Sequence, residues 1–467
     1  MNVEIVQQVT ARVNKVLSKD LLEKLAIESG FMRRSNGKIS AFAFVMALVV
    51  QASANGKITL VGMAELMRSF CGASITAQAL CSRLGSIYAV RLLRRCYSHI
   101  LSLKTELSRD KLEEAGLLGK FENILIEDST YCTLNEHVSE SFKGVGGSAS
   151  KSGYKIHTIW NAITSKFLSL DITPGNVTDQ SRCNHILSML KPVDLVLRDL
   201  GYFSISCFKE IANKKAFFLS RFKIGVRVYT LDGKLIEDLP GYLDEKIGDS
   251  NMVETDVLIG AKYKFRVRLA AYLVPTSVYE QRRRKQNRCS QKNGRTTSKV
   301  SKNFARYTML ITNIPTDFIS ADKLITLYGF RWQIELIFKT FKSNLNIHMI
   351  RGQKKERVEC YIISRLIAIV AISNIFSDLM TYVYGEFGRE LSFDKFVSWV
   401  LRHRYLMVLF CPEQLDSRVM QMKDLNILTL CKQKRSRKTS RELLEAEATF
   451  EEIYPSFQSG KKEQLAC

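Results

Sequence analysis

The hydrophobic and polar positions of residues 324–342, LITLYGFRWQIELIFKTFK, predict one amphipathic helix. Apolar side chains at 330, 334, 337 and 341 fall on one side of it. At about 100° per residue, five polar side chains share an arc of roughly 80° on the opposite side: Tyr328, Arg331, Glu335, Lys339 and Lys342. This polar face suits a metal-binding carboxylate with phosphate-binding cations beside it. Glu335 and Lys339 alone also fit an ordinary surface ion pair.

Residues 120–223 contain a series of apolar runs that predicts a mixed α/β core. We expect strands at 121–130 (FENILIEDST), 153–164, 166–173, 193–202 (VDLVLRDLGY) and 216–222, with helices at 179–190 and 204–213. This order is that of an RNase H-like core: three adjacent strands, a helix, a strand, a helix and a strand.

Two aspartates close the first and fourth of these strands. Because side chains alternate along a strand, Asp128 shares a face with Ile126 while Glu127 points the other way, and Asp199 aligns with Leu197. An acid at the end of a strand more often forms a turn or a cap. Together with Glu335 on a later helix, however, the two aspartates form a candidate three-carboxylate cluster.

The remaining segments predict three further regions. Residues 1–119 are expected to be all-helical, with a helix, a turn at Cys71 and Gly72, and a second helix opened by Ser74 or Thr76. This is either a helix-turn-helix that reads DNA or an ordinary helical hairpin. The C-terminal region is expected to contain helices at 357–384, 392–404 and 438–453. A basic run at 432–441 is a linker or exposed patch, or alternatively a DNA contact.

The segment from about 224 to 314 predicts an inserted, mainly β subdomain with an Asp232–Gly233 hairpin turn. Four cations at its centre would share one face, which is a phosphate platform or a solvated surface: Lys262, Lys264, Arg266 and Arg268. Residues 281–306 hold ten Lys or Arg and no acid, which predicts a mobile basic loop that orders on DNA.

Composition supports a nucleic-acid partner. The chain of 467 residues carries 69 basic and 46 acidic residues, a formal net charge of +23, which favours a polyanion over a membrane surface. Its 11 cysteines form no zinc-ligand pairs, so we expect no zinc site and reduced thiols. The N-terminus lacks a signal-peptide pattern, and the apolar runs at 39–52 and 366–376 are shorter than the ~20 residues of a membrane span. We therefore expect a cytoplasmic protein without a membrane partner.

Three motifs together resemble a known family. The spacing of Tyr328, two residues, Arg331, three residues, Glu335, six residues and Lys342 resembles the signature of a subgroup of bacterial insertion-sequence DDE transposases. IEDST at 126–130 and LRDLGYF at 197–203 look like the first- and second-aspartate motifs of that family. The resemblance runs from about residue 124 to 342.

The resemblance implies an α/β fold in which an RNase H-like catalytic core is interrupted by a mainly β insertion. The implied domains are 1–119, a helical candidate for DNA binding; 120–223, the first part of the core; 224–314, the insertion with its basic loop; 315–360, the part of the core with the Glu-bearing helix; and 361–467, a helical region and candidate for dimerisation.

The resemblance also implies the site. Asp128, Asp199 and Glu335 would be catalytic ligands of two Mg²⁺ ions, for which Mn²⁺ can substitute, while Tyr328, Arg331 and Lys342 would contact DNA. From the polar helix face and the basic loop we add further candidate DNA contacts: Lys339, Arg282, Arg283, Arg284 and Lys299. All three tryptophans lie outside the insertion, so Phe304 or Tyr307 would have to take the place of the tryptophan that stacks on a flipped base in related enzymes.

The implied function is a DNA transposase that cuts double-stranded DNA at element ends and joins the 3′ hydroxyl to target DNA by two-metal-ion phosphoryl transfer. It would act as a homodimer, since two ends must be paired, in the bacterial cytoplasm and at the nucleoid when bound to DNA. A hairpin intermediate is implied by resemblance alone. Two alternatives stay open: a metal-dependent nuclease without strand transfer, and a non-catalytic DNA-binding derivative. The derivative has no physical reason to keep like charges together.

Overall fold

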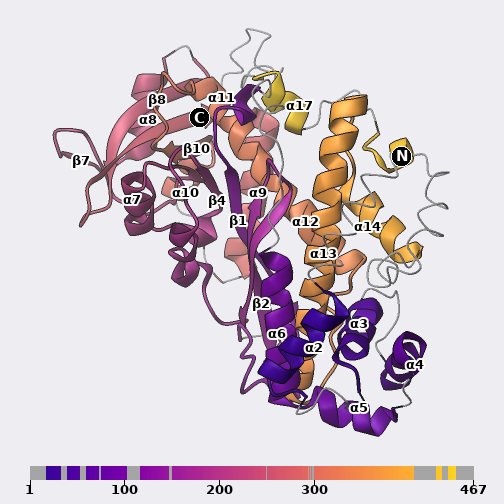
Figure 1. Ribbon diagram of the computed structural model, residues 1–467. Coiled ribbons are helices and arrows are strands. Elements are labelled where there is room, and N and C mark those ends of the chain that lie inside the picture. Colours follow the sequence, from indigo (N-terminus) through magenta and orange to yellow (C-terminus); the bar gives the residue numbers. More distant parts are fainter. Residues whose placement is uncertain are drawn as a thin grey trace. The chain divides into compact units, whose positions relative to one another are not determined.

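A computed structural model of the protein describes most of the chain as two compact units (Figure 1). The described residues are 17–32, 39–52, 59–72, 75–102, 116–146, 150–248, 250–292, 294, 296, 299–403, 427–433 and 440–448. Unit 1 comprises Met1–Arg109, Ser129–Val177 and Gln333–Arg435, and unit 2 comprises Asp110–Asp128, Thr178–Trp332 and Ser436–Cys467. Both units are therefore assembled from segments that are distant in sequence.

Unit 2 is built on a mixed sheet. Its strand order is β1 (Ile124–Thr133), β4 (Leu195–Arg198), β5 (Phe217–Arg221), β10 (Tyr307–Thr312), β9 (Phe265–Leu273), β8 (Met252–Ile259), β6 (Val228–Tyr229) and β7 (Leu235–Ile236). The strands β1, β4 and β5 run parallel, and the pairs from β5 to β7 are antiparallel. All four residues of β4 are buried, as expected for a parallel strand that is covered on both faces.

Helical segments complete unit 2. They are η2 (Gly116–Leu118), η4 (Asp179–Arg182), η5 (His185–Ser188), η6 (Leu200–Tyr202), α7 (Ile205–Asn213), α8 (Leu239–Ile247), α9 (Thr276–Lys292), α10 (Lys299–Phe304), α11 (Ala321–Gly329), η7 (Phe330–Trp332) and α17 (Ser440–Glu445). The strand and helix predictions for 193–222 are confirmed. The predicted helix at 179–190 is wrong: two 3-10 turns form because Ser181 and Ser188 donate hydrogen bonds to nearby carbonyls.

Unit 1 is mainly helical around a long central helix. Its elements are α2 (Lys19–Glu28), α3 (Ala41–Ala52), α4 (Leu60–Cys71), α5 (Ala77–Leu84), α6 (Ile87–Leu101), η3 (Glu136–Val138), β2 (Gly153–Asn161), β3 (Lys166–Pro174), α12 (Gln333–Ser343), α13 (Lys355–Phe387), α14 (Phe393–Arg402) and η9 (Ile427–Leu430). The antiparallel pair β2–β3 neighbours the end of β1 that belongs to this unit. The predicted turn between α4 and α5 is confirmed, with Gly72 at φ 68° and the Thr76 side chain capping α5.

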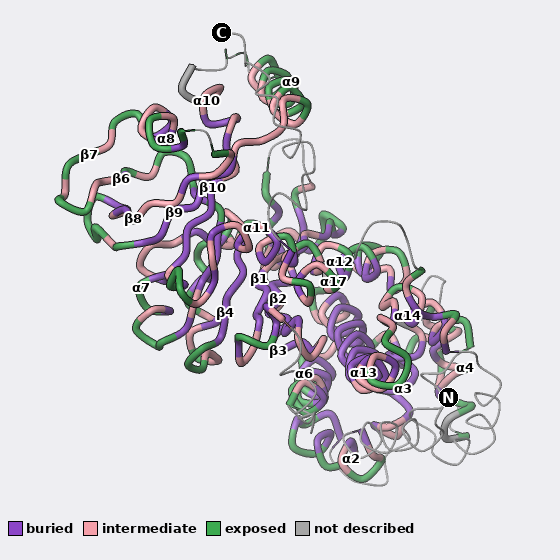
Figure 2. Tube along the Cα trace, turned by 90° about the horizontal axis from the view of Figure 1, so that it is seen from above, coloured by how far each residue is buried: buried purple, intermediate pink, exposed green. Residues whose placement is uncertain are grey.

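The helix α13 is the core of unit 1 and packs beside α6 and α3 (Figure 1). It is buried along most of its length (Figure 2). Its 33 residues are long and apolar enough to cross a membrane, but 94% of its most apolar window is buried inside the fold. The apolar run at 366–376 is the middle of this longer helix. The prediction of a buried helix is confirmed.

The helix predicted across 324–342 is interrupted. It consists of α11, the 3-10 turn η7 and α12, so Tyr328, Arg331 and Glu335 lie on three different elements. The interruption follows Gly329, which has a low helix propensity. The arc of polar side chains that we expected on one continuous helix is therefore retained only by the residues of α12.

Two predictions for the insertion are corrected, whereas the hairpin around Asp232 and Gly233 is confirmed, with Gly233 at φ 89°. Most of the predicted basic loop is helical, as α9 and α10. The predicted cationic face is not a shared surface, because Arg268 is only 5% exposed. Its guanidinium pairs with Glu254 and donates to the carbonyls of Ile314 and Ile319.

The buried Arg268 generates a stability prediction. Replacing it with Ala should lower the free energy of unfolding by about 2–3 kcal/mol, because two carbonyls would lose their donor and the Glu254 carboxylate would keep only the Thr316 hydroxyl. Arg266→Ala is the matched control, since Arg266 pairs with Asp256 at the surface and should matter much less. Urea denaturation measures both changes, and equal losses would contradict the structural role of Arg268.

Candidate active site

Asp128 and Asp199 lie side by side on neighbouring parallel strands of unit 2. The register pairs Glu127 with Arg198, so the next residue on each strand is an aspartate. Asp199 continues β4 with extended backbone, at φ −85° and ψ 168°. Neighbouring strands are ~4.8 Å apart, which places the two carboxylates on the same side of the sheet. The predicted alternation is confirmed, although β1 continues past Asp128 to Thr133 instead of ending there.

A buried ion pair on the opposite face of the sheet from the aspartates stabilises this register. The Glu127 Oε2 and Arg198 Nη2 atoms are 2.7 Å apart, and their side chains are 3% and 0% exposed. Burial raises the pKa of Glu127 from 4.5 to about 7, although the charge of Arg198 opposes the shift. The pair therefore links β1 to β4 one residue before each aspartate. The sequence predicted that Glu127 points to the opposite face from Asp128, but not that Arg198 is its partner, which the shared strand register could have identified.

Arg331 and Tyr328 lie against the two aspartates. The Arg331 Nη1 atom is 3.1 Å from Asp128 Oδ2, and the Tyr328 hydroxyl donates to the Arg198 carbonyl at 3.3 Å. The Arg331 guanidinium also lies over the Tyr328 ring, 5.9 Å from its centroid. Burial raises the pKa of Tyr328 to about 12, with a further contribution from the charge of Asp199. Unit 2 thus brings together four of the predicted site residues.

The other signature residues lie on α12 of unit 1. Glu335 is half-buried in its first turn, Lys339 is exposed and Lys342 is half-buried, while Ile334 and Phe341 pack inward. Because Glu335 belongs to unit 1 and the aspartates to unit 2, the three-carboxylate cluster stays a prediction. Within the described part of either unit, no three His, Cys, Asp or Glu side chains gather as a metal site.

The candidate DNA contacts on the helix α9 of the insertion differ in their exposure to solvent. Arg282 faces inward and donates to the carbonyls of Ala305 and Tyr307, whereas Arg283 and Arg284 are exposed. Arg284 also pairs with Glu280 at 3.3 Å. Lys299 begins α10, and its side chain lies outside the described residues.

The prediction that Phe304 or Tyr307 takes the place of a stacking tryptophan is wrong. Phe304 is 9% exposed and Tyr307 is 3% exposed, so neither ring offers a free face. The Tyr307 hydroxyl is also bonded to Asp244.

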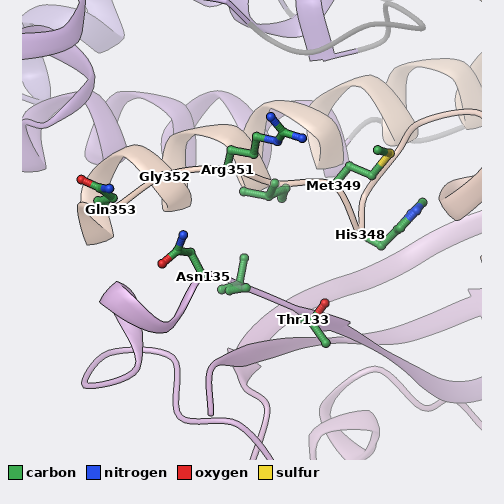
Figure 3. Close-up of a pocket in the computed structure, with 9 residues that line it drawn as sticks. Thr133, Asn135, His348, Met349, Arg351, Gly352 and Gln353 are labelled. Carbon is green, nitrogen blue, oxygen red and sulfur yellow. The ribbon is translucent and has the colours of Figure 1, made fainter. Parts of the chain in front are cut away.

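Unit 1 contains a separate open pocket of about 560 Å³ (Figure 3). It lies between the segment Thr133–Asn135 at the end of β1 and residues 348–353, which follow α12. His348, Arg351 and Gln353 are exposed members of its lining. Sequence reasoning singled out none of these residues, because they lie in irregular segments without a recognisable pattern.

Adjacent carboxylates on parallel strands, with an arginine paired to one of them in a strongly basic protein, are compatible with an enzyme that transfers phosphoryl groups of nucleic acids. A family model described as "Transposase DDE domain" matches residues 119–371, more than half of the chain. The chain belongs to this family, and the protein is a DNA transposase. Enzymes of this kind cut and join DNA and depend on divalent metal ions.

Relatives along most of the chain agree with this assignment. The chain is 28% identical over 407 residues to the transposase for insertion sequence element IS231D of Bacillus thuringiensis subsp. finitimus, covering 84% of each chain. It is 27% identical over 405 residues to the transposase for IS1151 of Clostridium perfringens, covering 81% of this chain and 84% of the relative. A cryo-EM structure of the piggyBac transposase synaptic complex with hairpin DNA aligns with a TM-score of 0.46 at 12% identity, over 93% of this chain and 87% of that chain.

The pKa of Glu127 predicts how stability depends on pH. Between pH 4.5 and about 7 the folded protein holds a proton that the unfolded chain has released. The free energy of unfolding should therefore decrease as pH rises through this window. Glu127→Gln should reduce that decrease, whereas Glu136→Gln, at an exposed pair, should not. Urea denaturation in EDTA at several pH values checks this, and parallel pH profiles for wild type and Glu127→Gln would contradict it.

Proposed function

We propose that the protein is the transposase of a bacterial insertion sequence. It cuts double-stranded DNA at the ends of the element and joins the freed 3′ hydroxyl to target DNA. The observation that carries this proposal is the shared register of Asp128 and Asp199, with Arg331 against Asp128. The names of the relatives, which are transposases of insertion sequence elements, support the choice of substrate.

The donor set of the proposed site fits Mg²⁺. Hard cations prefer carboxylate oxygen, and the site offers Asp128 and Asp199 without a nitrogen or sulfur ligand. We assign Glu335 as the third ligand of two Mg²⁺ ions, with Mn²⁺ able to substitute. When bound, such ions activate the attacking oxygen and stabilise charge on the leaving oxygen.

The side chains around the carboxylates would position DNA. Arg331 already contacts a carboxylate oxygen, and a guanidinium binds phosphate oxygen with the same geometry, so it can hold the phosphate beside the reacting one. Tyr328 orients Arg331 through its ring and leaves its hydroxyl at the edge of the site. Lys339 and Lys342, one and two turns after Glu335, would hold flanking phosphates.

The finer architecture is part of the same proposal. We infer an RNase H-like core, supported by the parallel strands β1, β4 and β5 of unit 2 and the antiparallel pair β2–β3 of unit 1. The domain limits 1–119, 120–223, 224–314, 315–360 and 361–467 accompany it. Two copies would pair the two ends of the element in the bacterial cytoplasm.

Asparagine or glutamine at the proposed ligands tests the chemistry. Asp128→Asn, Asp199→Asn and Glu335→Gln should each lower Mg²⁺-dependent cleavage and strand transfer by at least about 10²-fold, because a neutral amide is a poor metal ligand. DNA binding should persist, and Asp256→Asn on β8 is the control. Cleavage without joining by the wild type would favour a nuclease, and full activity of Glu335→Gln would refute its assignment.

The exposed face of α9 predicts a salt effect. Arg283→Ala combined with Arg284→Ala should reduce the salt dependence of DNA binding by about one unit of slope for each phosphate that is no longer neutralised. The matched control is Lys209→Ala, an exposed cation on α7 of the same unit. Fluorescence anisotropy at several salt concentrations measures the slope. An unchanged slope would show that this face is merely solvated.

Arg331 should influence metal affinity as well as DNA. Removing its positive charge beside Asp128 with Arg331→Ala should tighten Mn²⁺ binding to the DNA-free protein by about fivefold. The same change should weaken DNA cleavage, because alanine cannot bind the phosphate. A Mn²⁺ titration followed by electron paramagnetic resonance measures the first effect, and weaker Mn²⁺ binding would contradict this role.

A further inference from the structure

Two cysteines of unit 2 lie against the ion pair that supports the aspartates. Cys183 follows η4 and is 5% exposed, and Cys207 lies in the first turn of α7 and is fully buried. The Cys207 Sγ atom is 3.0 Å from the Cys183 carbonyl oxygen, and the two thiols hydrogen-bond to each other. The two cysteines are therefore direct neighbours, as a disulfide between them requires.

Arg198 connects this thiol pair to the site. Its Nη1 atom is 3.0 Å from Cys207 Sγ, and its Nη2 atom donates to the Cys183 carbonyl at 2.5 Å. The same guanidinium forms the ion pair with Glu127. Arg198 thus contacts both cysteines directly, and it immediately precedes Asp199 in the chain.

The surroundings favour thiolate chemistry at Cys183. The hydrogen bond from Cys207 lowers the pKa of the Cys183 thiol, and the charge of Arg198 also lowers it, so the thiolate is favoured at Cys183. The pKa of Cys207 is raised, because it is the donor of that hydrogen bond and is buried. Burial alone instead raises the pKa of Cys96 to about 12, as is typical of an inert core cysteine.

We propose that Cys183 and Cys207 are an oxidation site, at which a hydroperoxide converts the two thiols to a disulfide and thereby lowers strand transfer. The effect on strand transfer rests on the proposed function. In a reducing cytoplasm such a disulfide is transient, as is typical of redox-sensing pairs.

The chemistry balances with hydrogen peroxide as the oxidant. The Cys183 thiolate attacks the O–O bond, takes one oxygen as a sulfenic acid and releases hydroxide, which collects the proton released when Cys183 ionised. The Cys207 thiol then attacks the sulfenic sulfur, forms the S–S bond and releases water. In total, two thiols lose two electrons and two protons, and one peroxide becomes two waters.

Arg198 transmits the change to the site. As part of a disulfide, the Cys207 sulfur that accepts from Arg198 is a weaker acceptor, so the guanidinium is held less firmly on that side. Bond formation also draws the start of α7 toward Cys183. A displacement of a reacting group by about 1 Å can cost on the order of 10²-fold in rate. We expect oxidation to reduce strand transfer by at least about tenfold, reversibly on adding dithiothreitol.

To test this, the full-length protein is treated with hydrogen peroxide, and its tryptic peptides are mapped without reduction. Strand transfer is assayed before and after dithiothreitol is added. Cleavage after Arg182, Arg198 and Lys209 leaves each cysteine on its own peptide, so only a disulfide joins 183–198 to 199–209. The expected result is this linked pair together with a reversible loss of transfer. Its absence, with the exposed Cys289 oxidised in the same sample, would overturn the site.

Variants separate the regulatory effect from other oxidation. Cys183→Ser and Cys207→Ser should each form no linked pair and keep their transfer activity in peroxide, whereas Cys289→Ser should behave as wild type. Melting temperatures identify a variant that fails to fold, and the peptide map of the wild type needs no variant. A linked pair with unchanged transfer would overturn the regulatory claim. The peptide map does not depend on transposition, so a protein inactive on DNA would still reveal the disulfide.

Discussion

The ion pair between Glu127 and Arg198 is the interaction on which the proposed site depends. Both side chains are almost completely buried, and each lies one residue before an aspartate on a neighbouring parallel strand. A slip of one residue between β1 and β4 would turn one aspartate into the core and would leave a buried charge without its partner, which costs several kcal/mol. The buried pair therefore specifies the register, and the register places the two carboxylates together.

Two adjacent carboxylates repel each other, and a neighbouring cation compensates for that repulsion. Arg331 forms an ion pair with Asp128, and the packing of its guanidinium on the Tyr328 ring holds it there. In the proposed site the carboxylates would bind divalent cations, and Arg331 would then be available to a phosphate.

The sequence contained enough information for the strands and the aspartates, because alternation and chain order are local patterns. It was insufficient wherever tertiary contacts decided the outcome. Gly329 ended a helix that the periodicity of 324–342 continued, and the burial of Arg268 depends on carbonyls from residues 314 and 319, far from it in sequence. The basic segment at 281–292 is helical, and Arg282 donates to the Tyr307 carbonyl on β10, a contact that charge counting cannot reveal. The helix-turn-helix and the basic run at 432–441 stay predictions. Residues 434–439 of that run lie outside the described part of the chain.

The central claim is that Asp128, Asp199 and Glu335 bind the same metal ions although they belong to two units. Replacing Mg²⁺ by Fe²⁺ and adding ascorbate and peroxide generates hydroxyl radicals at the metal, which cut the backbone nearby. Mass spectrometry of the fragments from the DNA-bound protein should locate cuts near all three residues, and excess Mg²⁺ should suppress them. Cuts near 128 and 199 alone, with none near 335, would contradict the three-carboxylate site.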